Sequence, residues 1–262
     1  MKPVLEAVLC LLPLSLVAGI RTFDNADLCS EIRESFENAS QASWRTRACQ
    51  CFPGHGDGDG VSTGPWLGCS GKNANPFNIY QSLAALPNET QVSTLWIWDS
   101  LLPLLRGDVF ERVRPRKLVV ENSMLVEITK DAFERLGPSL RSLELRGNKI
   151  KRLDDGTLES LTRLESLSLA SNNLSAVTAE TFRGLERLQT LSLENNVLGK
   201  LPIGAVSSLS ELRSLNLAGN KLETLESGVF RGMDKLEVLN LARNQISSLQ
   251  KETFADLKSL KV

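Results

Sequence analysis

The stretch LRSLELRGNKI, residues 140–150, decides how this chain folds, because further stretches copy it at a constant spacing. The copies are LESLSLASNNL (164–174), LQTLSLENNVL (188–198), LRSLNLAGNKL (212–222) and LEVLNLARNQI (236–246). Each copy begins 24 residues after the one before it. A constant period of this length indicates a solenoid, in which similar units stack and each buries its apolar side against its neighbours.

Each copy has the pattern L-x-x-L-x-L-x-x-N-x-L. The central L-x-L predicts a short strand with both leucines pointing inward, so that strands of successive units form a parallel sheet. An asparagine follows each strand, and its amide has the donors and the acceptor that turn backbone groups need once stacking has buried them. The second half of each unit, such as residues 179–188, predicts a turn or short helix on the convex side. The predicted asparagine ladder consists of Asn148, Asn172, Asn196, Asn220 and Asn244.

Looser copies of the pattern extend the repeats towards the N-terminus. Residues 92–105 and 115–128 each contain a predicted strand, with serine in place of the ladder asparagine. The repeats therefore span residues 92–262, with seven strands and an eighth that begins at Leu260. The last unit has no polar cap, which solenoids need for solubility, so we expect the chain to be a fragment of a longer protein.

Residues 1–19 are typical of a secretory signal peptide. Lys2 precedes an apolar run from residue 8 to residue 18, and Glu6 is the one departure from the pattern, which leaves retention as a membrane anchor as the alternative. Three sequons for N-glycosylation, at Asn38, Asn88 and Asn173, fit the secretory route. We therefore expect the protein to be secreted or to lie on the extracellular side of the plasma membrane, with any further membrane anchor beyond Val262.

Residues 20–91 form a predicted cysteine-rich cap. Removal of the signal peptide removes Cys10, so the mature chain keeps four cysteines, Cys29, Cys49, Cys51 and Cys69. In a secreted chain this cluster predicts two disulfides, and the spacing by itself allows three connectivities. Zinc is the alternative, but Cys49 and Cys51 lack the two-residue spacing of zinc ligands and His55 is the only histidine. We expect no metal and no cofactor.

The repeats and the cysteine cluster before them resemble the extracellular leucine-rich repeat proteins of animals. The resemblance implies an α/β fold, a leucine-rich repeat solenoid with a curved parallel sheet, short helical or irregular convex segments and a disulfide-bonded N-terminal cap. It also implies the disulfides Cys29–Cys51 and Cys49–Cys69, although the gap between Cys29 and Cys49 is longer than in compact caps of this family. Because the family includes adhesion molecules, Toll-like and other receptors, matrix proteins and secreted subunits, it implies binding without naming a ligand.

Residues 49–71 and 118–148 carry a narrower resemblance. They are similar to arthropod leucine-rich repeat proteins grouped with the non-catalytic subunit of the shrimp (oplophorus) luciferase. That resemblance implies a scaffold or a stabilising partner of an enzyme, and no active site in this chain.

The repeat register predicts a binding patch at the N-terminal end of the concave face. Trp96 and Trp98 flank the inward-pointing Ile97, so both are expected to point outward from the sheet, and tryptophan is the residue type in which binding energy most often concentrates. The alternative is that the cap, which contains Trp44 and Trp66, folds over these two side chains and buries them. The predicted patch consists of Trp96, Trp98, Asp99, Arg116, Lys117, Glu121, Glu144 and Arg146.

Motifs for catalysis are missing from the sequence. In the glycine-rich residues 54–60, a calcium loop that began at Asp57 would have Gly68 where it needs a glutamate. These residues also lie between cysteines and do not join a strand to a helix as a nucleotide loop does. No Gly-x-Ser-x-Gly or His-Glu-x-x-His motif occurs. Glu121 and Glu144 form a conceivable carboxylate pair, but neighbouring basic residues favour ion pairing, and nothing in the sequence predicts a pocket that would raise a pKa. We expect the protein not to be an enzyme.

These observations predict a non-enzymatic, extracellular protein-binding module. Its formal charge of -1 argues against a nucleic-acid partner. We expect the ectodomain of an adhesion or recognition receptor that binds a protein ligand on its concave face. The alternative is a secreted, non-catalytic subunit or scaffold that stabilises a partner enzyme.

Overall fold

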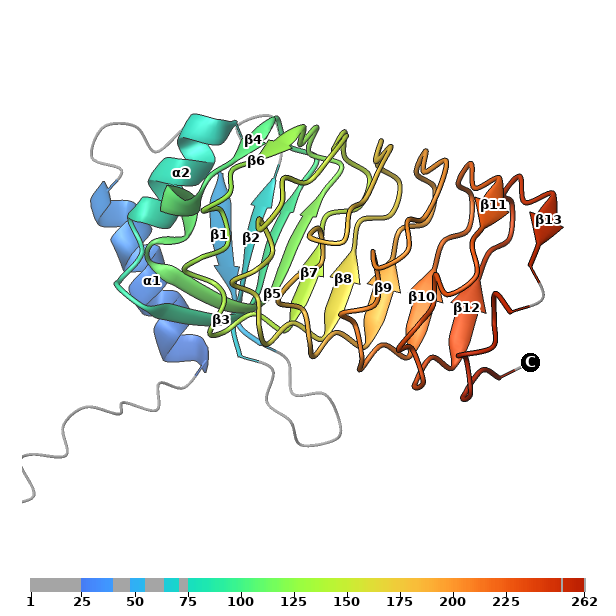
Figure 1. The fold of residues 1–262 in the computed structure, drawn as a ribbon. Helices are drawn as coiled ribbons and strands as arrows, with labels where there is room; N and C mark the ends of the chain where they lie inside the picture. Colours follow the sequence, from blue (N-terminus) through green and yellow to red (C-terminus); the bar gives the residue numbers. More distant parts are fainter. Residues whose placement is uncertain (1–24, 40–47, 55–63, 71–74, 251, 262) are drawn as a thin grey trace, which may run out of the picture.

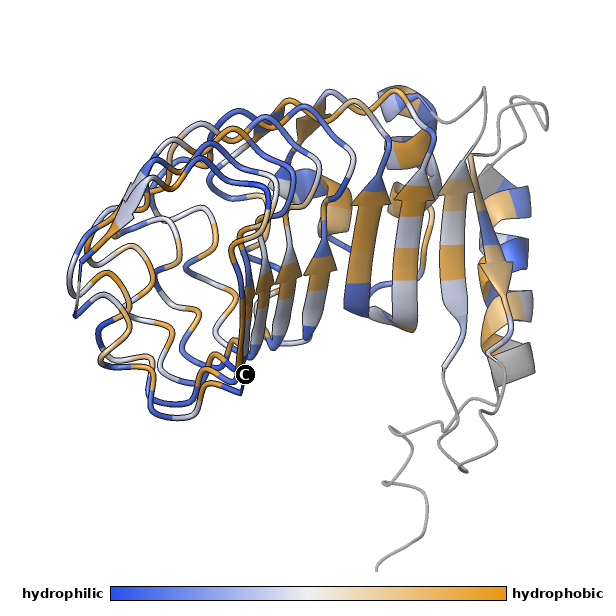
Figure 2. Ribbon diagram, turned by 90° about the vertical axis from the view of Figure 1, so that its right-hand side faces the viewer, coloured by the Kyte–Doolittle hydropathy of each residue, from blue (hydrophilic) through white to orange (hydrophobic). Residues whose placement is uncertain are grey.

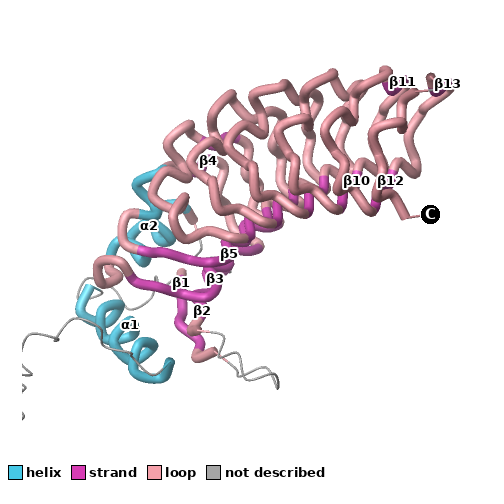
Figure 3. The backbone as a smooth tube through the Cα atoms, turned by 60° about the horizontal axis from the view of Figure 1, so that its bottom comes forward, coloured by secondary structure: helices cyan, strands magenta, loops and turns pink. Residues whose placement is uncertain are grey.

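The computed structural model describes residues 25–39, 48–54, 64–70, 75–250 and 252–261. The chain winds into a solenoid with one long sheet on its concave side and mostly irregular loops on the other side (Figures 1 and 3). The predicted signal peptide, residues 1–19, lies outside the described residues. No helix in the described segments is long and apolar enough to cross a membrane.

The predicted repeat strands are present and pair in parallel. They are β3 (Thr90–Trp98), β5 (Val113–Glu121), β7 (Ser142–Glu144), β8 (Ser166–Ser168), β9 (Thr190–Ser192), β10 (Ser214–Asn216) and β12 (Val238–Asn240). Leucines at the same place in each unit face one another, as Leu143 faces Leu167 and Leu167 faces Leu191, and all three are fully buried. The predicted fold class, a leucine-rich repeat solenoid, is therefore confirmed.

The loops opposite the sheet close the core. The regular elements here are short: β4 (Leu104–Leu105) pairs with β6 (Glu127–Ile128), β11 (Thr224–Leu225) pairs with β13 (Ser248–Leu249), and η1 (Gly107–Phe110) is a 3-10 helix. Phenylalanines from four units, Phe110, Phe133, Phe182 and Phe230, are fully buried. Hydrophobic segments, orange in Figure 2, accordingly recur from one coil to the next. Burial of these rings and of the strand leucines supplies the main stabilisation of the fold.

The cap continues the repeat sheet. The strands β1 (Cys49–Phe52) and β2 (Trp66–Ser70) pair with each other antiparallel, and β2 pairs with β3 in parallel. The sheet therefore has nine strands and crosses the boundary predicted at residue 91, because backbone pairing between β2 and β3 does not require the leucine pattern. Two helices, α1 (Asn25–Ala39) and α2 (Pro76–Ala84), complete the described part of the cap.

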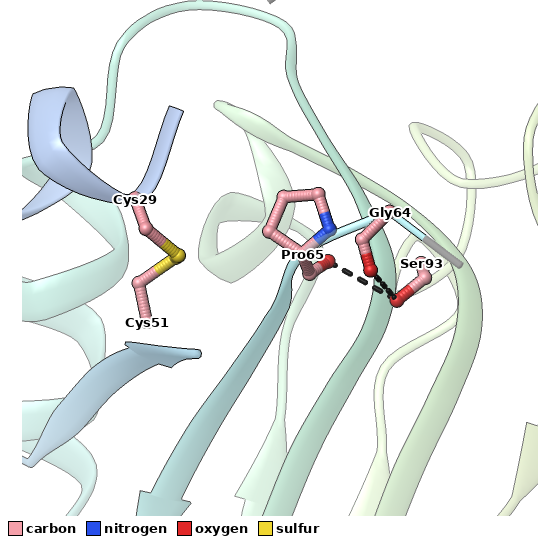
Figure 4. Close-up of a disulfide and its surroundings, with 5 residues drawn as sticks. All are labelled: Cys29, Cys51, Gly64, Pro65 and Ser93. Atoms are coloured by element: carbon pink, nitrogen blue, oxygen red, sulfur yellow. Dashed lines mark hydrogen bonds between the residues drawn. A yellow bond between two sulfur atoms is a disulfide. The ribbon is translucent and has the colours of Figure 1, made fainter. Parts of the chain in front are cut away.

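Disulfides and local hydrogen bonds hold the cap together. Cys29 of α1 bonds to Cys51 of β1, and Cys49 bonds to Cys69 in the neighbouring strand, which are the pairs that the family resemblance implies. Figure 4 shows the first of these bonds, together with the hydroxyl of Ser93 in β3, which donates to the carbonyl oxygens of Gly64 and Pro65 over 2.6 and 3.1 Å. These bonds attach the residues just before β2 to the first repeat strand.

Every repeat strand leads into the same left-handed backbone position. The φ angle is positive at the residue just before each ladder position, from +47° at Asp99 to +70° at Gly147. Asparagine, aspartate and glycine enter this region more readily than other residues, and they fill most of these positions. The full set is Asp99, Asn122, Gly147, Ser171, Asn195, Gly219 and Arg243.

The asparagine ladder follows these left-handed residues. The Nδ2 atom of Asn172 donates to the carbonyl oxygens of Leu145 and Leu169 over 2.8 and 3.1 Å, and its Oδ1 atom accepts from the backbone nitrogen of Ile150 over 3.1 Å. Asn148, Asn196, Asn220 and Asn244 make equivalent bonds. The ladder therefore links each unit to the one before it.

Candidate binding site on the concave face

The concave side chains align in columns as the repeat register predicts. Trp96 lies opposite Val119, and Val119 lies opposite Glu144. In the next column Trp98 lies opposite Glu121. Because parallel pairing sets these neighbours, residues more than twenty positions apart in the sequence come into side-chain contact.

Four aromatic side chains form a row across β1, β2 and β3, which we call the aromatic row: Phe52, Trp66, Trp96 and Trp98. The Phe52 and Trp66 rings stack with centroids 4.1 Å apart, the Trp66 and Trp96 centroids are 6.1 Å apart, and the Trp96 and Trp98 centroids are 5.0 Å apart. The two separations between tryptophans are typical of favourable aromatic pairs. The row joins the cap to the first repeat.

A glycine makes room for this arrangement. A Cβ atom added to Gly68 would lie 2.8 Å from Cζ3 of Trp66 and 3.0 Å from two ring atoms of Trp98. Both indole rings therefore lie against the bare backbone of Gly68. Any larger residue at this position would displace at least one ring.

The described part of the cap lies beside the two predicted tryptophans. Trp66 extends the aromatic surface, since β2 adds to the edge of the sheet and does not cross its face. Trp96 keeps 36% of its surface exposed, whereas Trp98 is half-buried. Trp44, which the burial alternative also invoked, lies outside the described residues.

Next to the aromatic row is a depression of about 430 Å³, which we call the concave hollow. Val119, which is only 5% exposed, contributes an apolar lining between charged and aromatic side chains. The concave hollow is lined by Trp66, Thr94, Trp96, Lys117, Val119, Glu121, Glu144 and Arg146. The site therefore combines apolar surface with charged groups around it.

Glu121 organises one side of the concave hollow. Its side chain is 10% exposed, and each of its two oxygens accepts a hydrogen bond. Oε1 accepts from Nε1 of Trp96 over 3.0 Å, and Oε2 accepts from Nε of Arg146 over 2.7 Å. The hydrogen bond and the negative charge of Glu121 raise the pKa of Arg146, so the guanidinium stays charged. One buried carboxylate thus orients both the indole and the guanidinium.

A second ion pair lies across the concave hollow. Nζ of Lys117 is 2.6 Å from Oε1 of Glu144, with the two side chains 43% and 27% exposed. Glu121 and Glu144 are thus each paired with a different cation. This is the ion pairing with neighbouring basic residues that the sequence favours for these two carboxylates.

The structure brings together five residues of the predicted patch and leaves three outside the concave hollow. Trp96, Lys117, Glu121, Glu144 and Arg146 line it. Trp98 does not line the hollow. Its ring lies against Gly68 and packs on the ring of Trp96. Asp99 is exposed in the left-handed turn after β3, and Arg116 is exposed where β5 bends.

The bend in β3 and β5 explains the position of Arg116. The buried side chains in β5 run Val113, Pro115 and then Leu118, so the alternation of a strand is interrupted between residues 115 and 118. Arg116 and Lys117 both fall in this interruption, and only Lys117 reaches the concave hollow. The 24-residue pattern contains no information about this bend, because the later strands are only three residues long.

Residues that the sequence did not assign to the patch complete the site. Trp66 lies in a strand whose sequence, WLGCS, lacks the repeat pattern, and Thr94 and Val119 are small or apolar residues without a distinguishing motif. Val119 lies between the buried Leu118 and Val120, so strand alternation places it on the concave face. Only the pairing of β2 with β3 brings Trp66 there.

The concave face beyond the concave hollow offers fewer anchoring groups. Asn216 donates from Nδ2 to Oε2 of Glu194 over 3.0 Å, and its Oδ1 accepts from the backbone nitrogen of Ala218 over 3.0 Å. The concave positions of β8 and β9 carry serine, threonine and alanine apart from Glu194. Within the described ranges, no group of three or more His, Cys, Asp or Glu side chains is placed to hold a metal ion. His55 and most of the glycine-rich loop lie outside those ranges.

The three sequons lie away from the concave hollow. Asn38 is in α1, Asn88 is in the turn before β3, and Asn173 is in the loop after β8. All three asparagines are exposed. Glycans at these positions would therefore extend from residues that do not line the site.

Comparison with known proteins agrees with this geometry. The family described as Leucine rich repeat matches residues 116–174, 162–222 and 210–262. A relative from Caenorhabditis elegans, P-granule-associated novel protein 1, is 29% identical over 149 residues, which are 57% of this chain and 24% of that protein. The chain thus spans about a quarter of the length of this relative.

A solved structure has the same fold. The crystal structure of a TLR13-ssRNA13 complex superposes with a TM-score of 0.56 and 25% sequence identity, covering 71% of this chain and 29% of that chain. The resemblance to arthropod luciferase-subunit proteins receives no support from these matches. Since the family matches extend over more than half of the sequence, the chain belongs to the leucine-rich repeat family.

Proposed function

We propose that this protein is a non-enzymatic recognition module that binds another protein through the cap end of its concave face. The observation that carries the proposal is the exposed indole of Trp96, held in place by Glu121 beside the apolar surface of Val119. A pre-oriented tryptophan next to a depression is typical of the residues that dominate binding energy. Little side-chain freedom remains to be lost on binding, which favours affinity.

The proposed location is extracellular, as in an adhesion or recognition receptor. Two disulfides support this location, because such bonds persist mainly in oxidising compartments. The three exposed sequons, which lie outside the concave hollow, are compatible with glycosylation that leaves the site accessible. The predicted receptor role and the predicted division into a cap and repeats at residue 91 remain proposals.

Nucleic acid is the competing class of ligand. The TLR13 structure was solved with an RNA, so the comparison does not support the exclusion of nucleic acid that the net charge suggested. Protein is favoured because the concave positions of β8, β9, β10 and β12 carry neither lysine nor arginine. A binding surface for single strands ordinarily provides a basic track along the backbone.

Site-specific photo-crosslinking would test the proposal. A photoreactive amino acid at Thr94, which lines the concave hollow, is compared with one at Ile203, which is 55% exposed in a loop between β9 and β10. Both variants are incubated with extracellular material from the source organism and, separately, with a labelled single-stranded RNA. We expect the Thr94 variant to crosslink a protein that the Ile203 variant does not.

Competition provides the control for this experiment. Excess unlabelled chain should abolish the crosslink, and excess Trp96→Ser chain should compete at least tenfold less well. Phe77→Ser, which removes a 66% exposed aromatic side chain from α2, should compete like the original chain. Equal crosslinking at both positions, or crosslinking of RNA alone, would contradict a protein-binding concave face.

A further inference from the structure

From the hydrogen-bonding groups of the concave hollow that have no partner among the described residues, we infer that it takes a carboxylate of the partner protein, an Asp or Glu side chain, next to an apolar or aromatic side chain. The inference rests on the proposed function and adds the chemistry of the partner. The four charged groups, Lys117, Glu121, Glu144 and Arg146, sum to zero formal charge, so net charge does not distinguish an acidic from a basic ligand. The hydrogen bonds and ion pairs that these four groups already make do distinguish the two kinds of ligand.

The two carboxylates expose few acceptor sites to a ligand. Both oxygens of Glu121 already accept hydrogen bonds, and its side chain is 10% exposed. Oε1 of Glu144 contacts Lys117, and the Glu144 side chain is 27% exposed. A cationic ligand would therefore find one partly exposed carboxylate oxygen, with two cations close to it.

The two cations keep most of their donors. In the part of the chain that the structure describes, the Arg146 guanidinium bonds to Glu121 through Nε, and its side chain is 61% exposed. The remaining donors on its two terminal nitrogens match the two oxygens of a carboxylate. Among the described residues Lys117 is paired with Glu144, and its side chain is 43% exposed. Donors thus exceed acceptors at the surface of the concave hollow, which favours a ligand that accepts.

Apolar surface lies within the same depression. Trp66 and Trp96 come from neighbouring strands, and Val119 lies opposite Trp96. An apolar side chain placed against these three would exclude water from the neighbouring donors, which strengthens their bonds to a carboxylate. The preferred occupant is therefore a partner segment with an acidic residue next to an aliphatic or aromatic one.

A polyanion fits the same face less well. A nucleic acid brings one phosphate charge per nucleotide, but cations line only the hollow end of the concave columns, at Lys117 and Arg146. Glu194 lies further along the same face and would repel phosphates. A single carboxylate at the concave hollow avoids this repulsion.

The inference is tested by titrating the whole chain with phenylacetate, with its neutral isostere phenylacetamide and with phenethylammonium. The measured quantities are the indole N–H resonances, assigned by Trp→Phe variants. Phenylacetate should bind at least tenfold more tightly than the other two probes and should move the resonances of Trp66 and Trp96. Arg146→Gln should reduce its affinity to that of phenylacetamide.

Arg183→Gln is the matched control. Arg183 is also exposed, at 63%, and is also paired with carboxylates, Glu159 and Glu180, but it does not line the concave hollow. It should leave the affinity for phenylacetate unchanged. Equal affinities for the three probes, or equal effects of the two arginine substitutions, would overturn the carboxylate preference.

The remaining outcomes separate this inference from the proposed function. If no probe moves the Trp66 and Trp96 resonances while Thr94 still crosslinks a protein, the inferred chemistry is wrong and protein binding stands. If a single-stranded RNA binds more tightly than phenylacetate and depends on Arg146, both proposals fail. Loss of phenylacetate binding in Arg146→Gln but not in Arg183→Gln, together with a protein crosslink, supports both.

Discussion

Replacement of Asn172 by alanine would test whether the ladder stabilises the fold by satisfying buried backbone groups. Asn172 is 7% exposed, and its side chain bonds to the carbonyl oxygens of Leu145 and Leu169 and to the backbone nitrogen of Ile150. The substitution removes all three bonds. It leaves the backbone nitrogen of Ile150 without its partner, whereas the carbonyl oxygens of Leu145 and Leu169 keep the bonds that they accept from Asn148 and Asn196 over 3.0 and 2.9 Å. The short strands beside them are otherwise unchanged.

The magnitude follows from these bonds. Leaving a buried donor or acceptor unpaired costs about 1–3 kcal/mol. That cost applies to the Ile150 nitrogen. Each carbonyl oxygen loses one of two side-chain donors and stays paired, which costs about 0.5 kcal/mol each, the low end of the net contribution of a hydrogen bond. We therefore expect Asn172→Ala to lower the free energy of unfolding by about 2–4 kcal/mol. With a urea m-value of about 3 kcal/mol/M, the unfolding midpoint would fall by about 0.7–1.3 M.

Asn244→Ala is the matched control. Asn244 makes the same set of bonds, donating to Leu217 and Leu241 over 2.9 Å and accepting from the nitrogen of Leu222 over 3.1 Å. Its side chain is only half-buried, so water can replace the lost bonds, and we expect a loss of about 1 kcal/mol. Urea unfolding followed by circular dichroism measures both variants. Equal losses in the two variants would refute the argument that burial of the unpaired backbone nitrogen sets the loss of stability.

Three further predictions concern the site and the strand ends. Gly68→Ala should displace an indole ring and lower stability by about 1–3 kcal/mol, with shifted indole resonances; unchanged resonances would show that the rings can accommodate a methyl group. Glu121→Gln keeps the shape of the side chain but removes its charge. It should lower the free energy of unfolding by about 1–2 kcal/mol and no more, because its partner Arg146 is largely exposed. Glu194→Gln, measured in the same urea assay, should lower it less, and the opposite order would count against Glu121 as the organising group. Arg243→Gly relieves a left-handed residue at φ +55° and should raise stability by up to about 1 kcal/mol, whereas a loss would indicate that the arginine side chain makes a stabilising contact.

Part of the candidate site was predictable because the repeat period fixes which residues are neighbours. Once each strand is aligned on its leucines, Trp96, Val119 and Glu144 must fall in one column, and the pairing of β3, β5 and β7 shows that they do. Contacts between side chains in different columns were harder to predict from the sequence. The bond from Trp96 to Glu121 runs diagonally, and it depends on side-chain angles that alternation does not specify.

Trp66 shows the limit of the periodic argument. It precedes the first recognisable repeat, and the strand around it pairs with β3 through backbone hydrogen bonds that any sequence can make. Nothing in WLGCS distinguishes this strand from a loop of the cap. The glycine at position 68 acquires its role only after Trp66 and Trp98 have been brought to the same face.

The sequence by itself determined the solenoid, the seven repeat strands, the ladder and the concave position of the two tryptophans, because each of these follows from a local pattern repeated at a fixed interval. Tertiary structure alone decided that the cap extends the sheet, that Arg116 lies at a bend outside the concave hollow, and that Trp66 joins the site. These features depend on packing between segments that share no pattern. The contacts that stabilise them form only when the cap and the first repeats are packed against each other.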